Sequence, residues 1–177
     1  MTLARRPIAM VKTSVLAVVA ALSLSTAAHA DTLKVGDRLA ELDVAVDGKG
    51  KPFKLKAYKG KWLVVTVGAA WCKPCAKELP AWDKMAPKYK AKVKFIAVNI
   101  DNDNAVGKKF NDKLKIKNLT RVYLPADKAS GDDNYETGTF PSTFVIDPKG
   151  IVRLVHKGFS SGDDGDMAEQ LDTLLGE

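Results

Sequence analysis

The sequence predicts an α/β fold: a mixed central β-sheet flanked by helices on both faces, with an extra N-terminal β-hairpin. The strongest observation is an apolar, β-branched run at 62–70 that leads directly into a stretch with helical spacing at 76–85. A second apolar run follows at 93–100. A strand, a helix and a strand in this order form a right-handed crossover, so we expect these two strands to pair in parallel. An antiparallel hairpin near the C-terminus makes the sheet mixed.

That hairpin comes from apolar runs at 143–146 and 151–155, which are separated by the turn residues Asp-Pro-Lys-Gly. The N-terminal hairpin has the same kind of pattern. Residues 42–46 alternate as a half-buried strand, a turn rich in glycine and lysine follows, and 52–55 returns. The chain closes with an amphipathic helix at 166–175.

A further helix is predicted after the strand at 93–100. Asp103 or Asn104 can accept hydrogen bonds from the free N–H groups at its start. A weaker strand is expected after it, at 121–124. The apolar stripe that would pack this helix against the sheet has four-residue spacing and consists of Val106, Phe110 and Leu114.

Residues 1–30 are predicted to be a cleaved signal peptide, which leaves one domain at 31–177. Positive residues precede a short apolar core at 15–24, and Ala28-His29-Ala30 matches an A-x-A cleavage site. We therefore expect a periplasmic protein that begins at Asp31. An uncleaved signal that anchors the chain to the membrane is the alternative.

The charge of the chain does not indicate a polyanionic partner. The formal net charge of +7 falls to +4 once the three positive residues of the signal are removed. Lysines gather at 49–61 and 84–94, and a solvated surface explains them better than a docking patch for acidic partners. Few aromatic residues lie among them, so we expect no binding of nucleic acid. We expect a monomer.

Chemistry is predicted at Cys72 and Cys75, the only cysteines in the chain, which form a Cys-x-x-Cys motif between the strand and the helix. Unpaired N–H groups and the positive end of the dipole at a helix N-terminus favour a thiolate there. Lys73 adds a positive charge. Cys75, one turn later, can attack a mixed disulfide formed at Cys72, which is the geometry of dithiol–disulfide exchange.

Three other interpretations of the pair were considered. A structural disulfide that encloses two residues would constrain the unfolded chain very little. A zinc site needs four ligands, and the only histidines are His29, in the signal, and His156. A site for Cu(I) made of two thiolates remains open, because soft thiolates suit that ion. We expect no resident metal and no cofactor other than the redox-active disulfide.

Two motifs together identify a family resemblance. Trp71-Cys72-Lys73-Pro74-Cys75 and Glu78-Leu79-Pro80 lie on the predicted helix, and Thr139-Phe140-Pro141-Ser142-Thr143 lies far downstream. The chain resembles the thioredoxin superfamily from about residue 33 to 175. It is most similar to the exported redoxin branch of TlpA- and ResA-like thiol–disulfide oxidoreductases, some of which serve cytochrome c maturation. The resemblance implies a thioredoxin fold.

The resemblance also implies roles for individual residues. Cys72 would be the exposed nucleophile, Cys75 the buried resolving thiol, and Glu78 a carboxylate near both. Pro80 would kink the helix. Pro141 would follow a cis peptide bond and help to hold a substrate strand. The expected client-binding surface consists of Trp71, Lys73, Pro74, Phe140 and Pro141.

The chain departs from the family pattern at Thr66, where thioredoxins proper carry a buried acid six residues before the first cysteine. Glu78 is then expected to be the only carboxylate available for moving the proton of Cys75. The alternative is a surface glutamate paired with Lys77 or Lys84. The segment before the motif also lacks the aromatic residues that the family often has there.

The predicted function is that of an exported protein-disulfide reductase. Its partners would be cysteine-containing exported proteins and a membrane electron donor of the thiol–disulfide type, because the periplasm is oxidising. An oxidase or isomerase that donates its disulfide is a second enzymatic interpretation, and a Cu(I)-handling protein is a non-enzymatic one. A peroxidase of the same fold would use cysteines with a different spacing.

Overall fold

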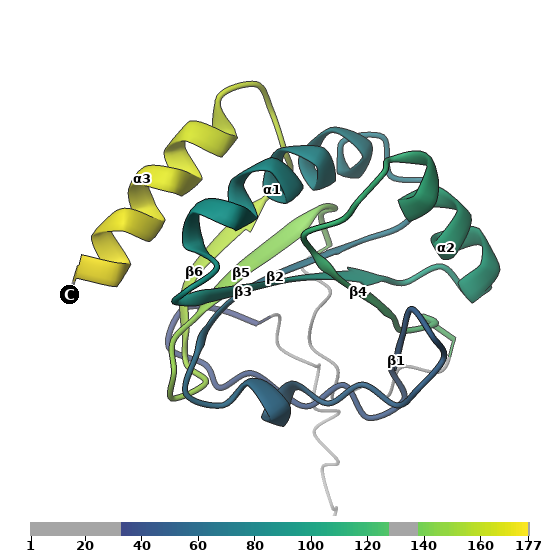
Figure 1. Cartoon of the computed structure of the whole chain (residues 1–177), viewed down its shortest axis with the longest axis horizontal. Coiled ribbons are helices and arrows are strands. Elements are labelled where there is room, and N and C mark those ends of the chain that lie inside the picture. Colours follow the sequence, from purple (N-terminus) through teal and green to yellow (C-terminus); the bar gives the residue numbers. More distant parts are fainter. Residues whose placement is uncertain (1–32, 128–137, 177) are drawn as a thin grey trace, which may run out of the picture.

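The computed structural model describes residues 33–127 and 138–176 (Figure 1). The predicted signal peptide at 1–30 lies outside the described residues, as do residues 128–137, which follow the predicted strand at 121–124. No helix in the described ranges is long and apolar enough to cross a membrane.

A single mixed sheet forms the centre of the fold, with its strands in the order β1-β4-β3-β2-β5-β6. Strand β3 pairs in parallel with β2 and with β4, as the two successive crossovers predict. The other three pairings, β1 with β4, β2 with β5 and β5 with β6, are antiparallel. The strands are β1 (Val46–Asp47), β2 (Trp62–Gly68), β3 (Val93–Asn99), β4 (Thr120–Tyr123), β5 (Ser142–Ile146) and β6 (Val152–Lys157).

Three α-helices cover one face of the sheet: α1 (Cys75–Tyr89), α2 (Asn104–Lys113) and α3 (Asp163–Gly176) (Figure 1). The crossovers from β2 to β3 and from β3 to β4 run in the same direction and are right-handed, so α1 and α2 lie on the same side. Side chains from the sheet and from all three helices form one apolar cluster there, with the indole of Trp82 fully buried in it.

The opposite face is covered by the N-terminal segment, which carries the only helix described on that side, the 3₁₀ helix η1 (Leu55–Tyr58) (Figure 1). Leu42 and Phe53 of this segment pack against Val65 and Ile96 of the sheet. Helices therefore lie on both faces, as expected, but the three described α-helices share one face and the 3₁₀ helix lies on the other. The expected N-terminal hairpin is short: Val46 bridges Pro52, and both residues of β1 pair with β4.

Two residues of the predicted stripe of α2, Phe110 and Leu114, pack against the core, and the third, Val106, does not. Val106 is 46% exposed and Phe110 is half-buried, whereas Gly107 and Asn111 are buried. The reason lies beneath the helix, where a Cβ added to Gly107 would lie 2.0 Å from Oδ1 of Asn99. The helix therefore rests on the last side chain of β3 through a glycine, and this contact turns Val106 towards solvent.

The candidate site lies where the parallel strands end. The N–H of Ile100 donates to the carbonyl of Gly68 at 3.0 Å, and the N–H of Leu124 donates to the carbonyl of Asn99 at 2.8 Å. These bonds hold the carboxyl ends of β2, β3 and β4 side by side. The loop that follows β2 carries the two cysteines into this edge of the sheet.

Candidate active site

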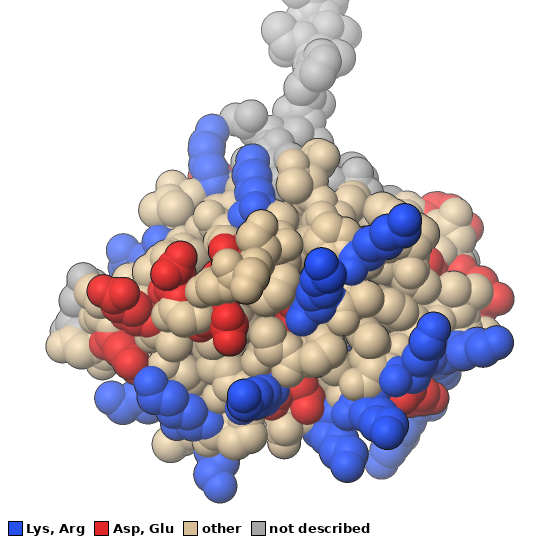
Figure 2. Space-filling model, turned by 90° about the horizontal axis from the view of Figure 1, so that it is seen from above, with Lys and Arg blue, Asp and Glu red and all other residues tan. Residues whose placement is uncertain are grey.

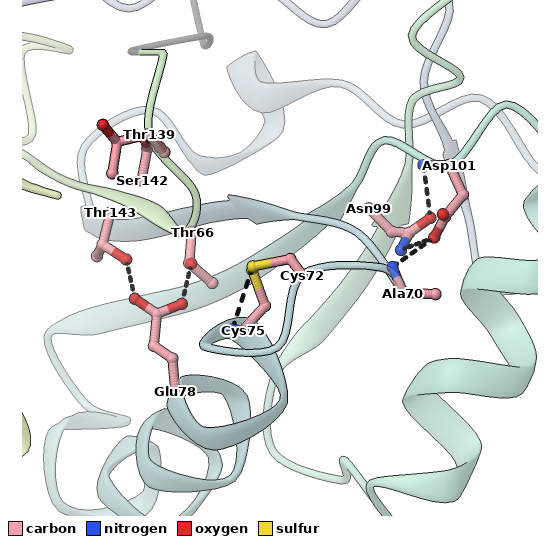
Figure 3. The surroundings of a disulfide bond; sticks show 10 residues. All are labelled: Thr66, Ala70, Cys72, Cys75, Glu78, Asn99, Asp101, Thr139, Ser142 and Thr143. Atoms are coloured by element: carbon pink, nitrogen blue, oxygen red, sulfur yellow. Dashed lines mark hydrogen bonds between the residues drawn. A yellow bond between two sulfur atoms is a disulfide. The ribbon is translucent and has the colours of Figure 1, made fainter. Parts of the chain in front are cut away.

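Cys72 and Cys75 form a disulfide at the start of α1, so the structure shows the oxidised state of the pair (Figure 3). Helix α1 begins at Cys75, and Cys72 lies in the turn before it rather than in the first helical turn as predicted. The consequence for Cys72 is small, because it still accepts from the helix start. The N–H of Cys75 donates to Sγ of Cys72 at 3.2 Å.

Neither cysteine is open to solvent. Cys72 is 5% exposed and Cys75 is 1% exposed, so Cys72 is not the exposed residue that the family resemblance implies. It is still the more accessible of the two, which suits the order of attack expected for a nucleophile and a resolving thiol. Trp71 and Lys73 stand out on either side of Cys72 in the sequence and are both exposed.

The small residues before the motif have a packing reason. A Cβ added to Gly68 would lie 2.5 Å from Sγ of Cys75, closer than real side chains approach. Gly68 therefore leaves the space that Cys75 occupies at the end of β2. The sequence had shown the segment before the motif only as lacking the aromatic residues that the family often has there.

Glu78 is buried on the inner side of α1 with no exposed surface. Thr66 Oγ1 donates to one carboxylate oxygen at 2.5 Å, and Thr143 Oγ1 donates to the other at 2.6 Å (Figure 3). The alternative of a surface glutamate paired with a lysine is therefore wrong. Thr66, which replaces the acid of thioredoxins proper, holds this carboxylate in place.

The burial of Glu78 changes its titration. Loss of hydration raises the pKa of this carboxyl group to about 7, against the opposing effect of the hydrogen bonds from Thr143 and Thr66. A small cavity of about 10 Å³ lies beside it. Glu78 and Cys75 both line that cavity, together with the polar side chains of Asn99 and Asn111. Such a volume is close to the minimum that holds one water molecule.

An aromatic surface borders the disulfide. Trp71 is 63% exposed, and its ring meets that of Phe140 edge to face at a centroid distance of 5.4 Å. The peptide bond between Phe140 and Pro141 is cis, as the resemblance implies. This ring contact brings the Phe140–Pro141 segment to the Cys-x-x-Cys motif. Of the other expected client-binding residues, Lys73 and Pro74 are exposed, whereas Pro141 is buried.

A second buried carboxylate was missed. Asp101 is 7% exposed and accepts a hydrogen bond from the N–H of Ala70 at 2.8 Å (Figure 3). Asp101 is therefore a second buried acid near the motif, but it bonds to the turn before Cys72, so the role of Glu78 with the proton of Cys75 stays a prediction. Asp101 lies in the polar cluster after β3, which the sequence showed only as a source of helix caps. Its neighbour Asp103 does fill that role, accepting from the N–H of Ala105.

Within residues 33–127 and 138–176, no three side chains of the metal-binding types His, Cys, Asp and Glu converge on one point. The zinc site considered for the cysteines has no set of ligands in this part of the chain. His156 faces Asp163 at 3.2 Å, at the start of α3.

Comparisons with known proteins agree with this geometry. Residues 35–155 match the AhpC/TSA family. The thioredoxin-like protein YneN of Bacillus subtilis (strain 168) is 30% identical over 123 residues, which cover 70% of this chain and 71% of that protein. The thiol-disulfide oxidoreductase ResA of Bacillus thuringiensis (strain Al Hakam) is 36% identical over 110 residues, 62% of each protein. The chain thus spans less than two thirds of that ResA.

Solved structures agree as well. A protein of Chlorobium tepidum assigned as a thiol:disulfide interchange protein DsbE is 29% identical, with a TM-score of 0.72. The match covers 81% of this chain and 99% of that one. A thiol:disulfide interchange protein from Bacteroides sp. is 26% identical, with a TM-score of 0.66 over 78% of this chain and 90% of that one. This chain therefore belongs to the AhpC/TSA family, and it is a thiol–disulfide oxidoreductase with the thioredoxin fold.

Proposed function

We propose that this chain is an exported protein-disulfide reductase in which Cys72 attacks and Cys75 resolves. The Cys72 thiolate attacks a client disulfide and forms a mixed disulfide, and the released client sulfur takes up a proton. The Cys75 thiolate then displaces the second client sulfur. The client is released as a dithiol, and Cys72 and Cys75 are left as the disulfide that the structure shows. A donor dithiol returns the two electrons.

Glu78 is our candidate for the base that takes the proton from Cys75. Support comes from its burial, its place on the same small cavity as Cys75, and a pKa of about 7, which suits proton exchange near neutral pH. Glu78→Gln should lower the rate of exchange and remove the part of its pH profile centred near 7. Glu169→Gln, at an exposed position on α3, is the matched control. An unchanged profile in Glu78→Gln would refute the role.

The direction of transfer is the finer part of the proposal, and the buried carboxylate of Glu78 is the observation that carries it. A strong oxidant such as DsbA has a stabilised reduced form. A carboxylate enclosed near the pair works in the opposite sense, because its negative charge repels a thiolate. Lys73 opposes this effect, but it is exposed, so water and salt screen its charge.

The reduction potential of the Cys72–Cys75 pair tests the direction. A potential near or below about −230 mV, the range of thioredoxin and the glutaredoxins, is the expected result. A potential above about −150 mV, towards that of DsbA, would mean that the protein donates disulfides. Equilibration with glutathione or dithiothreitol at pH 7 is suitable, using the chain from Asp31.

The proposed clients are exported proteins with cysteine pairs, including apocytochromes c, and the donor is a membrane protein with a reactive dithiol. Cys75→Ala should trap clients as mixed disulfides at Cys72, because nothing resolves them. Cys72→Ala is the control, since its remaining thiol is almost fully buried. Equal trapping by both variants would contradict the assignment of the nucleophile.

A further inference from the structure

The carboxylate of Asp101 has no catalytic assignment, yet it holds the turn that presents the nucleophile. The N–H of Ala70 donates to Oδ2 of Asp101 at 2.8 Å, across 31 positions of sequence. Ala70 belongs to a turn closed by the N–H of Cys72, which donates to the carbonyl of Ala69 at 3.1 Å. Asp101 therefore fixes the turn at the residue next to Trp71.

Asn99 in turn fixes Asp101. Its side-chain amide donates to the same Oδ2 at 2.8 Å, and its Oδ1 accepts from the N–H of Asp101 at 3.2 Å (Figure 3). Asn99 is 4% exposed and its backbone lies in β3. The two side chains therefore form a closed ring that is anchored in the sheet and reaches out to the active-site turn. Figure 3 shows this ring on the far side of the disulfide from Glu78.

Helix α2 packs against the ring that Asn99 and Asp101 form. Gly107 lies directly over the amide of Asn99, and a Cβ there would come within 2.0 Å of Oδ1 and 2.4 Å of Cγ. Neither atom is the far end of a long flexible chain, so a larger residue at 107 would have to displace the amide. The absence of a side chain at Gly107 therefore allows the amide of Asn99 to keep its position.

Among the residues that the structure describes, no lysine or arginine lies within salt-bridge distance of Asp101. Its partners are the N–H of Ala70 and the amide of Asn99, which are neutral donors. A buried carboxylate held by neutral donors is costly unless its bonds are well aligned. This cost favours a positional role over a merely stabilising one.

We propose that Asp101 is a positioning residue for thiol–disulfide exchange, held by Asn99 and Gly107, which fixes the Ala69–Cys72 turn for attack by Cys72. The Ala69–Cys72 turn is thereby anchored to the ends of β2 and β3. This inference rests on the exchange activity of the chain and not on the direction of electron flow. If the proposed direction of electron flow is wrong, the reduction potential of the wild type will show it, and the positioning role of Asp101 will not be affected.

Three variants of the purified protein test the proposal, with the rate of disulfide exchange and the redox equilibrium with glutathione as readouts. Asp101→Ala removes the acceptor and should slow exchange about tenfold, which corresponds to about 1.4 kcal/mol. Asp101→Asn keeps an oxygen for the N–H of Ala70, so its rate should stay within about twofold of the wild type. Loss of the negative charge should shift its equilibrium towards the dithiol.

Gly107→Ala is the remote variant. Alanine favours a helix over glycine, so α2 itself should be no less stable. Displacement of Asn99 should nevertheless slow exchange in the same direction as Asp101→Ala. Asp164→Ala is the control: it removes an exposed carboxylate in the first turn of α3, outside α2 and outside the ring of Asn99 and Asp101. Its exchange rate and glutathione equilibrium should match those of the wild type.

The outcomes separate cleanly. A slow Asp101→Ala and Gly107→Ala, a near-normal Asp101→Asn and a normal Asp164→Ala support the positioning role. Equal rates for Asp101→Ala and Asp164→Ala would overturn it. An Asp101→Asn protein that is as slow as Asp101→Ala would also overturn it, because the charge and not the acceptor would then be responsible. If Asp101→Ala does not fold, the Asn and Gly107 variants still decide.

Discussion

The burial of Glu78 makes the stability of the oxidised protein depend on pH in a direction that is unusual for a carboxylate. Its pKa is about 7 in the folded chain and ordinarily 4.5. The folded state therefore holds the proton more tightly than the unfolded state does, and stability falls as pH rises from about 4.5 through 7. Each pKa unit is worth about 1.4 kcal/mol, so the full loss is about 3 kcal/mol. Between pH 5 and pH 8 the expected loss is about 2 to 3 kcal/mol.

Glu78→Gln is the perturbation that isolates this effect. The amide has nearly the same shape and carries no charge at either pH, so the variant should lack this change of about 2 to 3 kcal/mol in the free energy of unfolding between the two pH values. The two threonines that donate to the carboxylate must share their bonds differently, which lowers stability equally at both pH values. Only the change with pH is therefore diagnostic.

Urea unfolding of the oxidised protein at pH 5 and pH 8 measures it. Cysteines in a disulfide do not titrate, so the pair adds nothing to the difference. Glu169→Gln, on the exposed side of α3, should behave as the wild type does. If the wild type and Glu78→Gln lose the same free energy of unfolding between the two pH values, Glu78 is not the buried acid described here and the reasoning fails.

Three further predictions concern separate parts of the molecule. Gly68→Ala should slow exchange by more than about tenfold, because its Cβ would overlap Sγ of Cys75, whereas Gly48→Ala, where a Cβ meets nothing within 4 Å, should have no effect on the rate. Trp71→Ala should raise the KM for a protein client severalfold and leave the exchange rate with a small disulfide unchanged; equal losses for both substrates would contradict a client-binding role. Arg153→Ala should lower the free energy of unfolding by about 1–3 kcal/mol at pH 7, because the buried carboxylate of Asp147 loses a charged partner at 2.7 Å. Burial alone would raise the pKa of Asp147, but hydrogen bonds from Ile151, Arg153 and Lys149 outweigh it, so this stability is lost as pH falls below about 4, and an equal effect of the variant at pH 3 and pH 7 would refute the assignment.

Apolar, β-branched runs predicted the central strands well, even though these strands are buried on both faces. The strand–helix–strand unit around the cysteines and the hairpin of β5 and β6 were expected close to their actual bounds. The apolar stripe of α2 was predicted wrongly at Val106. An amphipathic pattern reports which residues are apolar, and it cannot show that a polar side chain of β3 rises beneath the helix.

The distribution of the layers depended on the whole chain. Two parallel crossovers in one direction place α1 and α2 on the same face. The opposite face is closed by the N-terminal segment, which buries Leu42, Ala45, Phe53 and Leu55 but forms only a two-residue strand. The local pattern of 42–58 predicted a hairpin and did not show that β1 would pair with β4 instead.

The sequence by itself determined the chemistry of this protein. Two cysteines spaced three apart at a strand-to-helix junction permit dithiol exchange, because the reacting atoms belong to one turn of chain. Tertiary structure alone decided how the carboxylates act on that chemistry. Glu78 is buried because Thr66 and Thr143 reach it from two strands, and Asp101 meets Ala70 across 31 positions. The charge of a carboxylate is set by its hydration and its donors, and these exist only once distant segments are packed together.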